Sequence, residues 1–588
     1  MYTKTIEIKD IQFYNSDVGF GLVDMIGISN EVSAAQALHA GGWTLRRAYA
    51  KDYYESILAN ESGIYTKDFR NVLIYRVDVP EFGTYRVSVK CMAPSGGISD
   101  MALFSGRRNL FDSGINVPEG ITYEKDFFIN VTPYIPALSY VPCEEKAIYI
   151  SICGKNAGLS QITISKEDFP VLYMAGDSTL TDQNALTPFY PYKSCGGWAQ
   201  FMSQYFENIA VCNYAHSGLT SNCFLDDGHW DILTRFLKKN DIVMIQFGHN
   251  DQKRRNLAAF TGYLNSLRWY IKKIREFGAI PIICSPISRI PFWDDETKKY
   301  CSLLSDHALA AKKAADDLSA PFIDLHTLTF DRWVSLGEND VHDYFCDSTH
   351  TNEYGGRLIA RIVANEIKRQ KITPLTDYLC YRTLPPFTPD MDTKEVPVEP
   401  AGFNMFDIKP PYMDIKDIPQ YEGIKKAFKA GLLDPCIMHL HPEDSLPRAQ
   451  VLMPLFKALR LEGSRPYHGK YVDINRYEWD SSFIERCIKE KLIDENTIKN
   501  DRFRPDDPLT ALEFASLCER GLIKDIKKRE IDLTASFTKA KEDNIIPHDT
   551  GENDILCRAD IYSGLAEVSD LLGNEDKALP KDAEIHPV

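Results

Sequence analysis

Three different patterns of hydrophobic and polar residues divide the 588-residue chain into three parts. In its first part, residues 72–79, 84–90 and 147–153 alternate apolar and polar positions, and turn residues separate these runs. Alternation with a period of two is typical of strands that bury one face. We therefore predict an antiparallel β-sandwich over residues 1–168.

Over residues 169–383, short apolar runs alternate with amphipathic stretches. The apolar runs predict five strands, at residues 171–175, 209–214, 241–247, 279–284 and 321–325. Amphipathic stretches at residues 260–277 and 298–318 predict helices between the strands. This order predicts an α/β domain whose five-stranded parallel sheet is covered by helices on both faces. In such a sheet, functional residues gather at the carboxyl ends of the strands.

A proline-rich segment without periodicity, residues 384–402, predicts a linker. Beyond it, residues 403–588 contain a weak repeat of roughly 50 to 60 residues, and each copy predicts a pair of helices. Thr510 and Glu513 have the spacing of a capping box and mark the start of one of these helices. The chain as a whole is therefore predicted to be multidomain, with an all-α repeat domain at its end.

Charge and composition narrow the classes of partner. The net charge of −16 comes without a basic stripe, which argues against a nucleic-acid partner. No apolar run reaches the roughly 18 residues of a membrane-spanning helix, so we expect no membrane partner. The amino terminus lacks the apolar centre of a secretory signal, which favours a cytoplasmic protein, or a cell-surface one if an export signal was removed. The 14 cysteines include no C-x-x-C pair, so neither a metal site nor a disulfide framework is predicted.

Four short motifs carry the candidate chemistry. Ser178 follows the first predicted strand of the α/β domain, Gly218 follows the second, and Asn250 follows the third. Asp347 and His350 come after the fifth strand, in Cys-Asp-Ser-Thr-His. Because the carboxyl ends of parallel strands share one edge of the sheet, these residues can converge. A serine, a histidine with an orienting carboxylate, and hydrogen-bond donors for an oxyanion are sufficient for acyl transfer.

These motifs resemble the four sequence blocks of the SGNH (GDSL-type) hydrolases over residues 170–370. The segments Gly197-Trp198, Gln246-Phe-Gly-His-Asn-Asp-Gln-Lys253 and Thr349-His-Thr-Asn-Glu-Tyr-Gly355 further resemble the rhamnogalacturonan acetylesterases of carbohydrate esterase family 12. The resemblance implies a flavodoxin-like three-layer fold. It also implies an esterase that removes O-acetyl groups from pectic oligosaccharides or polysaccharides and needs no metal or organic cofactor.

The same resemblance implies a role for each site residue. Ser178 would be the nucleophile, His350 its general base, and Asp347 the carboxylate that orients the imidazole. The backbone N–H groups of Ser178 and Gly218 and the side-chain amide of Asn250 would form the oxyanion hole. Four further residues are candidates for substrate binding: Arg289, Lys253, Trp198 and His216.

Some alternatives remain open in the sequence. This branch of the family often has two arginines just after the glycine at 218, whereas this chain has Leu219 and Asn222. Without those cations, an acetylxylan or another acyl carbohydrate is an alternative substrate. By composition, His342 and Asp343 compete for the roles of base and orienting acid. A non-catalytic protein that binds cell-wall polysaccharide is an alternative of another class.

The flanking regions resemble known modules. The amino-terminal sandwich resembles galactose-binding-like domains, and the carboxyl-terminal repeats resemble S-layer homology domains. In the latter, Arg448 and Arg558 stand where the motif carries its arginine, and the middle copy has Ala511 instead. Such degenerate repeats imply self-association or a scaffold, with contact to a cell-wall glycan as the alternative.

Overall fold

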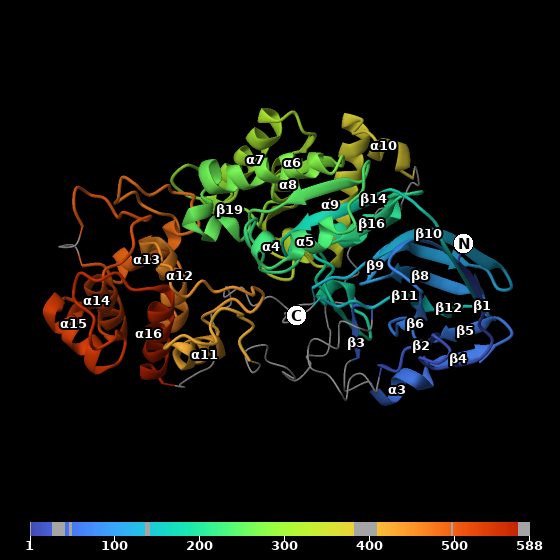
Figure 1. Cartoon of the computed structure of the whole chain (residues 1–588), viewed down its shortest axis with the longest axis horizontal. Helices are drawn as coiled ribbons and strands as arrows, with labels where there is room; N and C mark the ends of the chain where they lie inside the picture. Colours follow the sequence, from blue (N-terminus) through green and yellow to red (C-terminus); the bar gives the residue numbers. More distant parts are fainter. Residues whose placement is uncertain are drawn as a thin grey trace.

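The computed structural model describes residues 2–25, 41–45, 50–135, 142–380, 409–494 and 498–573. Three regions follow one another along the chain: a β-rich region in blue, a central α/β region in green, and a helical region in orange and red (Figure 1). The predicted linker at 384–402 lies outside the described residues, as do the boundaries at 383 and 403.

The amino-terminal region is built from antiparallel sheets. Its elements are β1 (Thr3–Glu7), β2 (Phe20–Leu22), β3 (Trp43–Leu45), α3 (Ala50–Glu55), β4 (Ile57–Asn60), β5 (Gly63–Thr66), β6 (Leu73–Asp78), β7 (Gly83–Met92), β8 (Ile98–Ser105), β9 (Asn109–Val117), β10 (Thr122–Val131), β11 (Ala147–Lys155), β12 (Ala157–Leu159) and β13 (Gln161–Lys166). A four-stranded sheet has the order β1-β13-β7-β10, and a five-stranded sheet has the order β2-β6-β11-β8-β9. A smaller sheet has the order β12-β5-β4, and β3 pairs in parallel with β15 (Ala185–Thr187) of the central region.

Alternation along β7 shows why these residues form strands. Tyr85, Val87, Val89 and Cys91 are all fully buried, while the residues between them are half-buried or exposed. Only an extended chain places every second side chain on the same face, so the sequence pattern matches the buried face of a sheet. The inward residues of both larger sheets belong to one buried apolar cluster.

The central region contains the five-stranded parallel sheet. The strands of this region are β14 (Val171–Gly176), β15 (Ala185–Thr187), β16 (Ala210–Asn213), β17 (Ile242–Gln246), β18 (Ile280–Cys284), β19 (Phe292–Asp294), β20 (Lys299–Cys301) and β21 (Phe322–Ile323), and three of them, β15, β19 and β20, lie outside the five-stranded sheet. Its α-helices are α4 (Cys223–Asp226), α5 (His229–Thr234), α6 (Leu264–Glu276), α7 (Ser305–Asp317), α8 (Leu325–Asp340), α9 (Glu353–Gln370) and α10 (Leu375–Tyr378). Short helical turns are η3 (Pro191–Lys193), η4 (Trp198–Phe201), η5 (Ser203–Tyr205), η6 (Asp251–Lys253), η7 (Arg255–Leu257), η8 (Ala259–Tyr263) and η9 (Val341–Tyr344).

The sheet has the order β16-β14-β17-β18-β21, and all its pairings are parallel. The five strands expected from the sequence are therefore present, although the last is shorter than predicted. It ends at Ile323 because the next residue, Asp324, caps α8 by accepting a hydrogen bond from the N–H of Thr327. The predicted helix at 298–318 begins only at Ser305, because β20 pairs with β19 before it.

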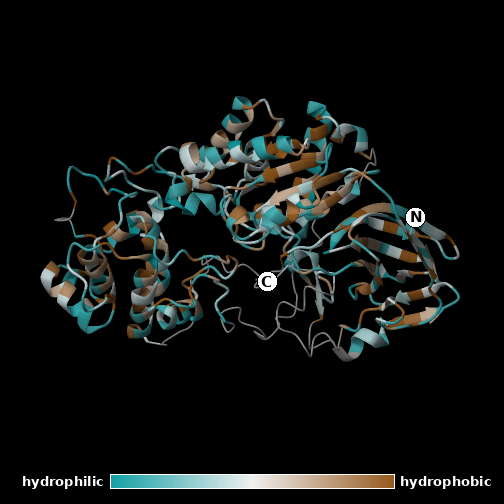
Figure 2. Ribbon diagram, in the orientation of Figure 1, coloured by the Kyte–Doolittle hydropathy of each residue, from teal (hydrophilic) through white to brown (hydrophobic). Residues whose placement is uncertain are grey.

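Side chains of the sheet alternate between two helical layers. In β14, Tyr173 belongs to the apolar cluster that includes residues of α6 and α7. Its neighbour Met174 belongs to the cluster that includes residues of η4 and α9. Figure 2 shows the strands of this sheet in the hydrophobic colour between more hydrophilic helices. Burial of both faces explains why these strands read as continuous apolar runs.

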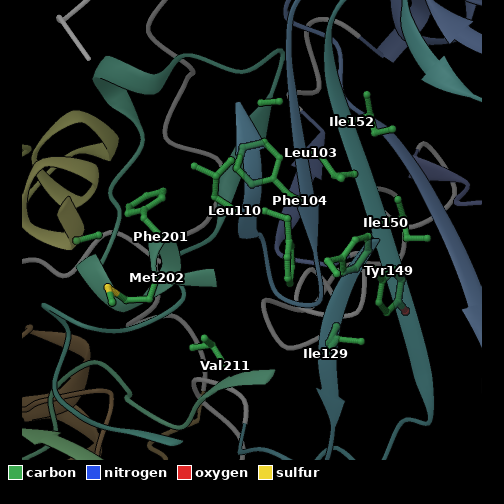
Figure 3. Packing of buried hydrophobic residues seen from close by; sticks show 14 of the residues in the cluster. Leu103, Phe104, Leu110, Ile129, Tyr149, Ile150, Ile152, Phe201, Met202 and Val211 are labelled. Carbon is green, nitrogen blue, oxygen red and sulfur yellow. The ribbon is translucent and has the colours of Figure 1, made fainter. Parts of the chain in front are cut away.

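The second of these clusters also joins the central region to the sandwich. Figure 3 shows Phe104 and Leu110 of the sandwich in the same cluster as Phe201, Met202 and Val211 of the central region. The sandwich and the α/β region therefore share one hydrophobic core.

A buried ion pair crosses the same boundary. Arg108 of the sandwich donates from Nη1 to Oε2 of Glu353 at 2.8 Å, and both side chains are fully buried. Arg108 also donates to the carbonyl oxygens of Gln183 (3.0 Å) and Cys195 (2.8 Å). Glu353 is the first residue of α9, three positions after His350. The sandwich thus holds the segment that carries the candidate catalytic histidine.

We expect Arg108→Ala to lower the free energy of unfolding by about 3 kcal/mol, because it leaves Oε2 of the buried Glu353 carboxylate without its partner, while Arg357 stays bonded to Oε1. Equilibrium unfolding in urea measures this change. Arg86→Ala is the matched control: its ion pair with Asp126 lies on the sandwich surface, where such pairs contribute about 1 kcal/mol or less. Equal destabilisation by the two variants would contradict the role given to Arg108.

The carboxyl-terminal region is helical. It contains α11 (Tyr421–Lys429), α12 (Arg448–Leu459), α13 (Ser481–Lys489), α14 (Ala511–Leu522), η13 (Ile526–Lys528), α15 (Leu533–Glu542) and α16 (Arg558–Leu571). The capping box predicted at the start of α14 is present, with Thr510 and Glu513 each bonding the other's backbone N–H. Short β-bridges join the segments that precede α12, α14 and α16: Ser445 with Cys557, Pro447 with Pro508, and Thr510 with Ile555. The three repeats are therefore closed on one another around a separate apolar core.

The helical region docks onto the central region through charged and polar pairs. They are Asp227 with His439 (2.9 Å), Arg255 with Asp506 (2.6 Å) and Asp294 with Arg476 (2.9 Å). Asp227 and Asp294 are buried. These contacts place the helical repeats beside the loops that follow the carboxyl ends of the strands.

Candidate active site

The turn after β14 holds the candidate nucleophile. β14 ends at Gly176, and Ser178 follows two residues later. A Cβ atom at Gly176 would lie 2.5 Å from the carbonyl oxygen of Gln246 in β17, so glycine is needed where the two strands approach. Ser178 is only 3% exposed, so its hydroxyl lies in a sheltered environment at the edge of the sheet.

Asp177 shapes this turn. Its Oδ1 accepts hydrogen bonds from the N–H (3.0 Å) and the hydroxyl (2.7 Å) of Thr179, and its Oδ2 accepts from the N–H of His249 (3.3 Å). Burial raises the pKa of Asp177, and these hydrogen bonds oppose the rise. The side chain therefore ties the Ser178 turn to the loop after β17.

Ser178, His350 and Asp347 form a continuous hydrogen-bonded chain. The Oγ atom of Ser178 lies 2.8 Å from Nε2 of His350. Nδ1 of His350 lies 2.8 Å from Oδ2 of Asp347. A proton on Nδ1 leaves Nε2 as an acceptor for the serine hydroxyl. This is the arrangement of a nucleophile, a general base and an orienting carboxylate.

Asp347 is held as a carboxylate by its surroundings. Burial acts to raise its pKa, but hydrogen bonds from His350 and from backbone N–H groups outweigh burial, and the pKa is lowered overall. Those backbone donors are the N–H groups of Thr349 and His350, both 2.7 Å from Oδ1. An ionised Asp347 can orient the imidazole of His350 and can stabilise its protonated form.

Donors for an oxyanion lie beside the nucleophile. Gly218 follows β16 and has a φ of +79°, and a Cβ atom there would lie 2.7 Å from Cβ of Cys436. Backbone geometry and space therefore both require glycine. Nδ2 of Asn250 donates to the carbonyl oxygen of Leu219 at 3.1 Å, which fixes the amide next to Gly218. Among the described residues, the backbone N–H groups of Ser178 and Gly218 have no hydrogen-bond acceptor, so both can stabilise an oxyanion.

Two of the residues expected from the sequence to bind substrate, Trp198 and His216, are buried in the structure. Trp198 is fully buried, and its Nε1 donates to Oε1 of Gln246 at 2.9 Å. Gln246 in turn donates to the hydroxyl of Thr179 at 2.7 Å. Trp198 is thus a positioning residue for the serine turn. His216 is 6% exposed, burial lowers its pKa to about 4, and its Nδ1 lies 2.9 Å from the carbonyl oxygen of Ser217.

The other two candidates lie at the site. Arg289 donates from Nη1 to the hydroxyl of Thr349 (2.6 Å), the residue before His350, and from Nη2 to the carbonyl oxygen of His249 (3.3 Å). Lys253 donates to Oδ1 of Asn250 at 3.3 Å. Both cations therefore contact segments that carry the catalytic and oxyanion residues.

The structure also decides between the two acid–base pairs that the sequence left open. Asp347 and His350 reach Ser178, as described above. His342 is exposed in η9, and the carbonyl oxygen of Asp343 accepts a hydrogen bond from Asn352 at 2.9 Å. Asp343 therefore supports the loop that leads into α9.

A cavity of about 740 Å³ opens beside the oxyanion donors. From the central region it is lined by Gly218, Asn250, Lys253, Arg289 and Ser348, among others. Its opposite wall belongs to the carboxyl-terminal repeats and includes Asp434, Arg465, Trp479 and Arg558. Trp198, His216 and the three residues Ser178, Asp347 and His350 are not among its lining residues.

The sequence patterns did not predict the residues of this opposite wall. The four residues named above follow His350 by 84 positions or more, in repeats whose motif pointed to a different role. Arg465 and Trp479 occur in irregular segments between α12 and α13, so no periodicity marks them. Only the docking of the repeats brings them to the site.

In the part of the chain that the structure describes, no three His, Cys, Asp or Glu side chains are grouped as metal ligands. All 14 cysteines lie in the described ranges and carry free thiols. Every described helix is too short or too polar to traverse a bilayer.

Comparisons with known proteins agree with this geometry. The model of the GDSL-like Lipase/Acylhydrolase family matches residues 174–358, which include the serine turn and the Asp–His pair. The probable rhamnogalacturonan acetylesterase YesY of Bacillus subtilis (strain 168) is 30% identical over 217 residues, or 35% of this chain and 95% of that protein. The rhamnogalacturonan acetylesterase RhgT of the same organism is 30% identical over 228 residues, or 36% of this chain and 94% of that protein.

Solved structures were compared as well. The crystal structure of protein YxiM from Bacillus subtilis is 19% identical, with a TM-score of 0.33. The match covers 63% of this chain and 99% of that chain.

Proposed function

This chain belongs to the GDSL-like lipase/acylhydrolase family and is a carboxylic ester hydrolase; from that premise we propose that it removes O-acetyl groups from plant cell-wall carbohydrate, foremost rhamnogalacturonan and related pectic oligosaccharides. The observation that carries the reaction is the hydrogen-bonded chain from Ser178 through His350 to Asp347. The carbohydrate assignment is supported by the two relatives named as rhamnogalacturonan acetylesterases.

The reaction follows from the positions of these side chains. His350 removes the proton from Oγ of Ser178 as the oxygen attacks the acetyl carbonyl carbon. The N–H groups of Ser178 and Gly218 and the amide of Asn250 stabilise the tetrahedral oxyanion. His350 then protonates the departing sugar hydroxyl and leaves an acetyl-serine. A water molecule, deprotonated by His350, attacks this ester and releases acetate, which restores the free serine.

The cavity supports an acidic glycan as the preferred substrate. Lys253, Arg254 and Arg289 all line it beside Asn250, and guanidinium groups suit carboxylates because they bind them in a bidentate manner. Acetylxylan is the second candidate, because Asn222 lines the same cavity at a position where the pectic branch often has arginine. Leu219, the other position of that difference, is fully buried and faces away from solvent.

Acetate release from acetylated rhamnogalacturonan oligosaccharides and from acetylated xylo-oligosaccharides tests both candidates. We expect a kcat/KM at least about tenfold higher on the pectic substrate, because only it carries carboxylates for the three cations. A preference for xylan would move the assignment to the second candidate. Release from neither substrate would overturn the carbohydrate assignment while leaving the ester hydrolase intact.

Asn250→Ala removes one oxyanion donor and is expected to lower kcat by roughly 10²- to 10³-fold with a small change in KM. The amide is needed mainly in the transition state, when the carbonyl oxygen becomes negative. Steady-state acetate release measures both constants. Asn256→Ala is the control, because Asn256 lines the same cavity away from the triad. A rise in KM with an unchanged kcat would show that Asn250 binds the ground state of the substrate instead.

A further inference from the structure

The cavity beside the oxyanion donors is completed by the carboxyl-terminal repeats. Its lining runs from Gly218 and Asn250, past Lys253 and Arg289, to Trp479 and Arg465. The Trp479 ring lies 4.8 Å from the guanidinium carbon of Arg289 and 5.2 Å from Nζ of Lys253. The two domains therefore meet at a shared group of cationic and aromatic side chains on the substrate side of the triad.

Arg465 is a cation without an acidic partner in this wall. Its guanidinium carbon lies 5.1 Å from the centre of the Phe292 ring. Across the described ranges no carboxylate lies within 4 Å of it. Burial, and then the positive charge of Arg289, lower its pKa to about 10, so the site favours an added negative charge. Asp480 is the one acid that opposes this shift, and its Oδ2 accepts a hydrogen bond from Nη1 of Arg255 at 3.2 Å.

Trp479 contributes an unused donor. Its Nε1 is buried and has no hydrogen-bond acceptor among the described residues. A buried indole N–H normally finds an acceptor, because leaving it unpaired is unfavourable. An oxygen of a ligand in the cavity would supply that acceptor.

The acidic residues on the cavity wall have other neighbours. Asp226 lies 3.9 Å from His441, Asp444 lies 3.9 Å from Arg558, and Asp434 accepts the N–H of Cys436 at 2.9 Å. A fourth, Glu462, is exposed. None of these contacts neutralises Arg465, so the end of the cavity at Arg465 and Arg289 remains the place for an anion.

We propose that Arg465 and Trp479 form a subsite for a hexuronate residue of the glycan, with its carboxylate at Arg465 and Arg289 and a sugar oxygen at Nε1 of Trp479. This rests on the proposed function, since the acetylated neighbour of that hexuronate would then lie at Ser178. The carboxyl-terminal repeats thereby determine specificity for acidic over neutral chains, in addition to their structural role. The cations absent after Gly218 are replaced from another domain.

Binding can be tested without turnover in the full-length Ser178→Ala protein. Isothermal titration calorimetry with trigalacturonate and with xylotriose compares an acidic and a neutral chain of equal length. We expect trigalacturonate to bind at least about tenfold more tightly than xylotriose, and Arg465→Gln to weaken trigalacturonate binding at least about tenfold. Arg465→Lys should lose less affinity for trigalacturonate than Arg465→Gln, because lysine keeps the charge but not the planar pair of donors.

Two further variants separate the subsite from general effects. Trp479→Phe keeps the ring but removes the N–H, and should weaken trigalacturonate binding roughly threefold. Arg502→Gln removes an exposed arginine of the same domain that does not line the cavity, and should leave both affinities unchanged. Thermal unfolding of each variant checks that it is folded.

The outcomes are distinct for the two proposals. Unchanged trigalacturonate affinity in folded Arg465→Gln and Trp479→Phe overturns the subsite. A loss of xylotriose affinity equal to the loss of trigalacturonate affinity overturns it as well. Failure of the Ser178-bearing protein to release acetate from any glycan overturns the proposed function, and the calorimetric result does not depend on it. A loss of affinity for trigalacturonate but not for xylotriose in both variants supports the subsite.

Discussion

Ser178→Ala is expected to lower kcat for ester hydrolysis by roughly 10⁶-fold, to the level left by substrate binding and the oxyanion hole alone. The methyl group of alanine cannot form the acetyl-enzyme, and His350 then has no hydroxyl at 2.8 Å to deprotonate. Substrate binding should remain, because the cavity and its cations are intact. Stopped acetate release together with retained binding in calorimetry is therefore the expected result.

The control for this variant is Ser335→Ala. Ser335 lies on the exposed side of α8, where its hydroxyl bonds only the carbonyl oxygen of Arg332 in the preceding turn. Its loss should change kcat by less than about twofold. If Ser178→Ala kept more than a hundredth of the activity, a different nucleophile would have to be sought.

Asp347→Asn is expected to lower kcat by roughly 10⁴-fold with a nearly unchanged KM. The carboxylate accepts hydrogen bonds from the Nδ1–H group of His350 and from two backbone N–H groups. An asparagine amide presents its own N–H to one of these donors, so the imidazole is driven towards the tautomer with the proton on Nε2. In that tautomer, Nε2 cannot accept the proton of Ser178.

Asp343→Asn provides the matched control, because Asp343 precedes the triad pair by only four residues and belongs to the alternative pair with His342. We expect it to change kcat by less than about threefold. Comparison of the kcat values of the two variants on one small acetyl ester is sufficient. The reverse order of effects would transfer the role of the orienting acid to Asp343.

The same geometry bears on the two flanking regions. The sandwich reaches the active site through Arg108, which holds Glu353 at the start of α9. The repeats reach it through Asp434 and Cys436, which pack against Gly218. In the repeats, Arg448 is buried and bonded to Glu513, and Arg558 faces the cavity, so both motif arginines have partners or positions inside this chain. Contact with a cell-wall glycan and self-association remain predictions.

Much of the central region could be derived from the sequence. The five strands, their parallel order in a covered sheet, and the meeting of Ser178, Asp347 and His350 at its edge all follow from short local patterns. The reason is physical: a buried parallel strand must be apolar on both faces, and a catalytic side chain must follow the strand that presents it. Ser178, Gly218 and Asn250 each follow one strand closely, so position along the chain predicts position in space.

Other features depended on contacts between residues far apart in the chain. Tryptophan is a residue type that often binds sugars, but Trp198 lies in the core, where it is hydrogen-bonded to Gln246. Arg465 and Trp479 belong to irregular segments, and docking of the repeats brings them to Arg289. By itself, then, the sequence determined the reaction and the strand ends that carry it, because these depend on residue type and local periodicity. The tertiary structure alone decided which side chains surround the substrate, because packing between domains depends on complementary surfaces that leave no local pattern.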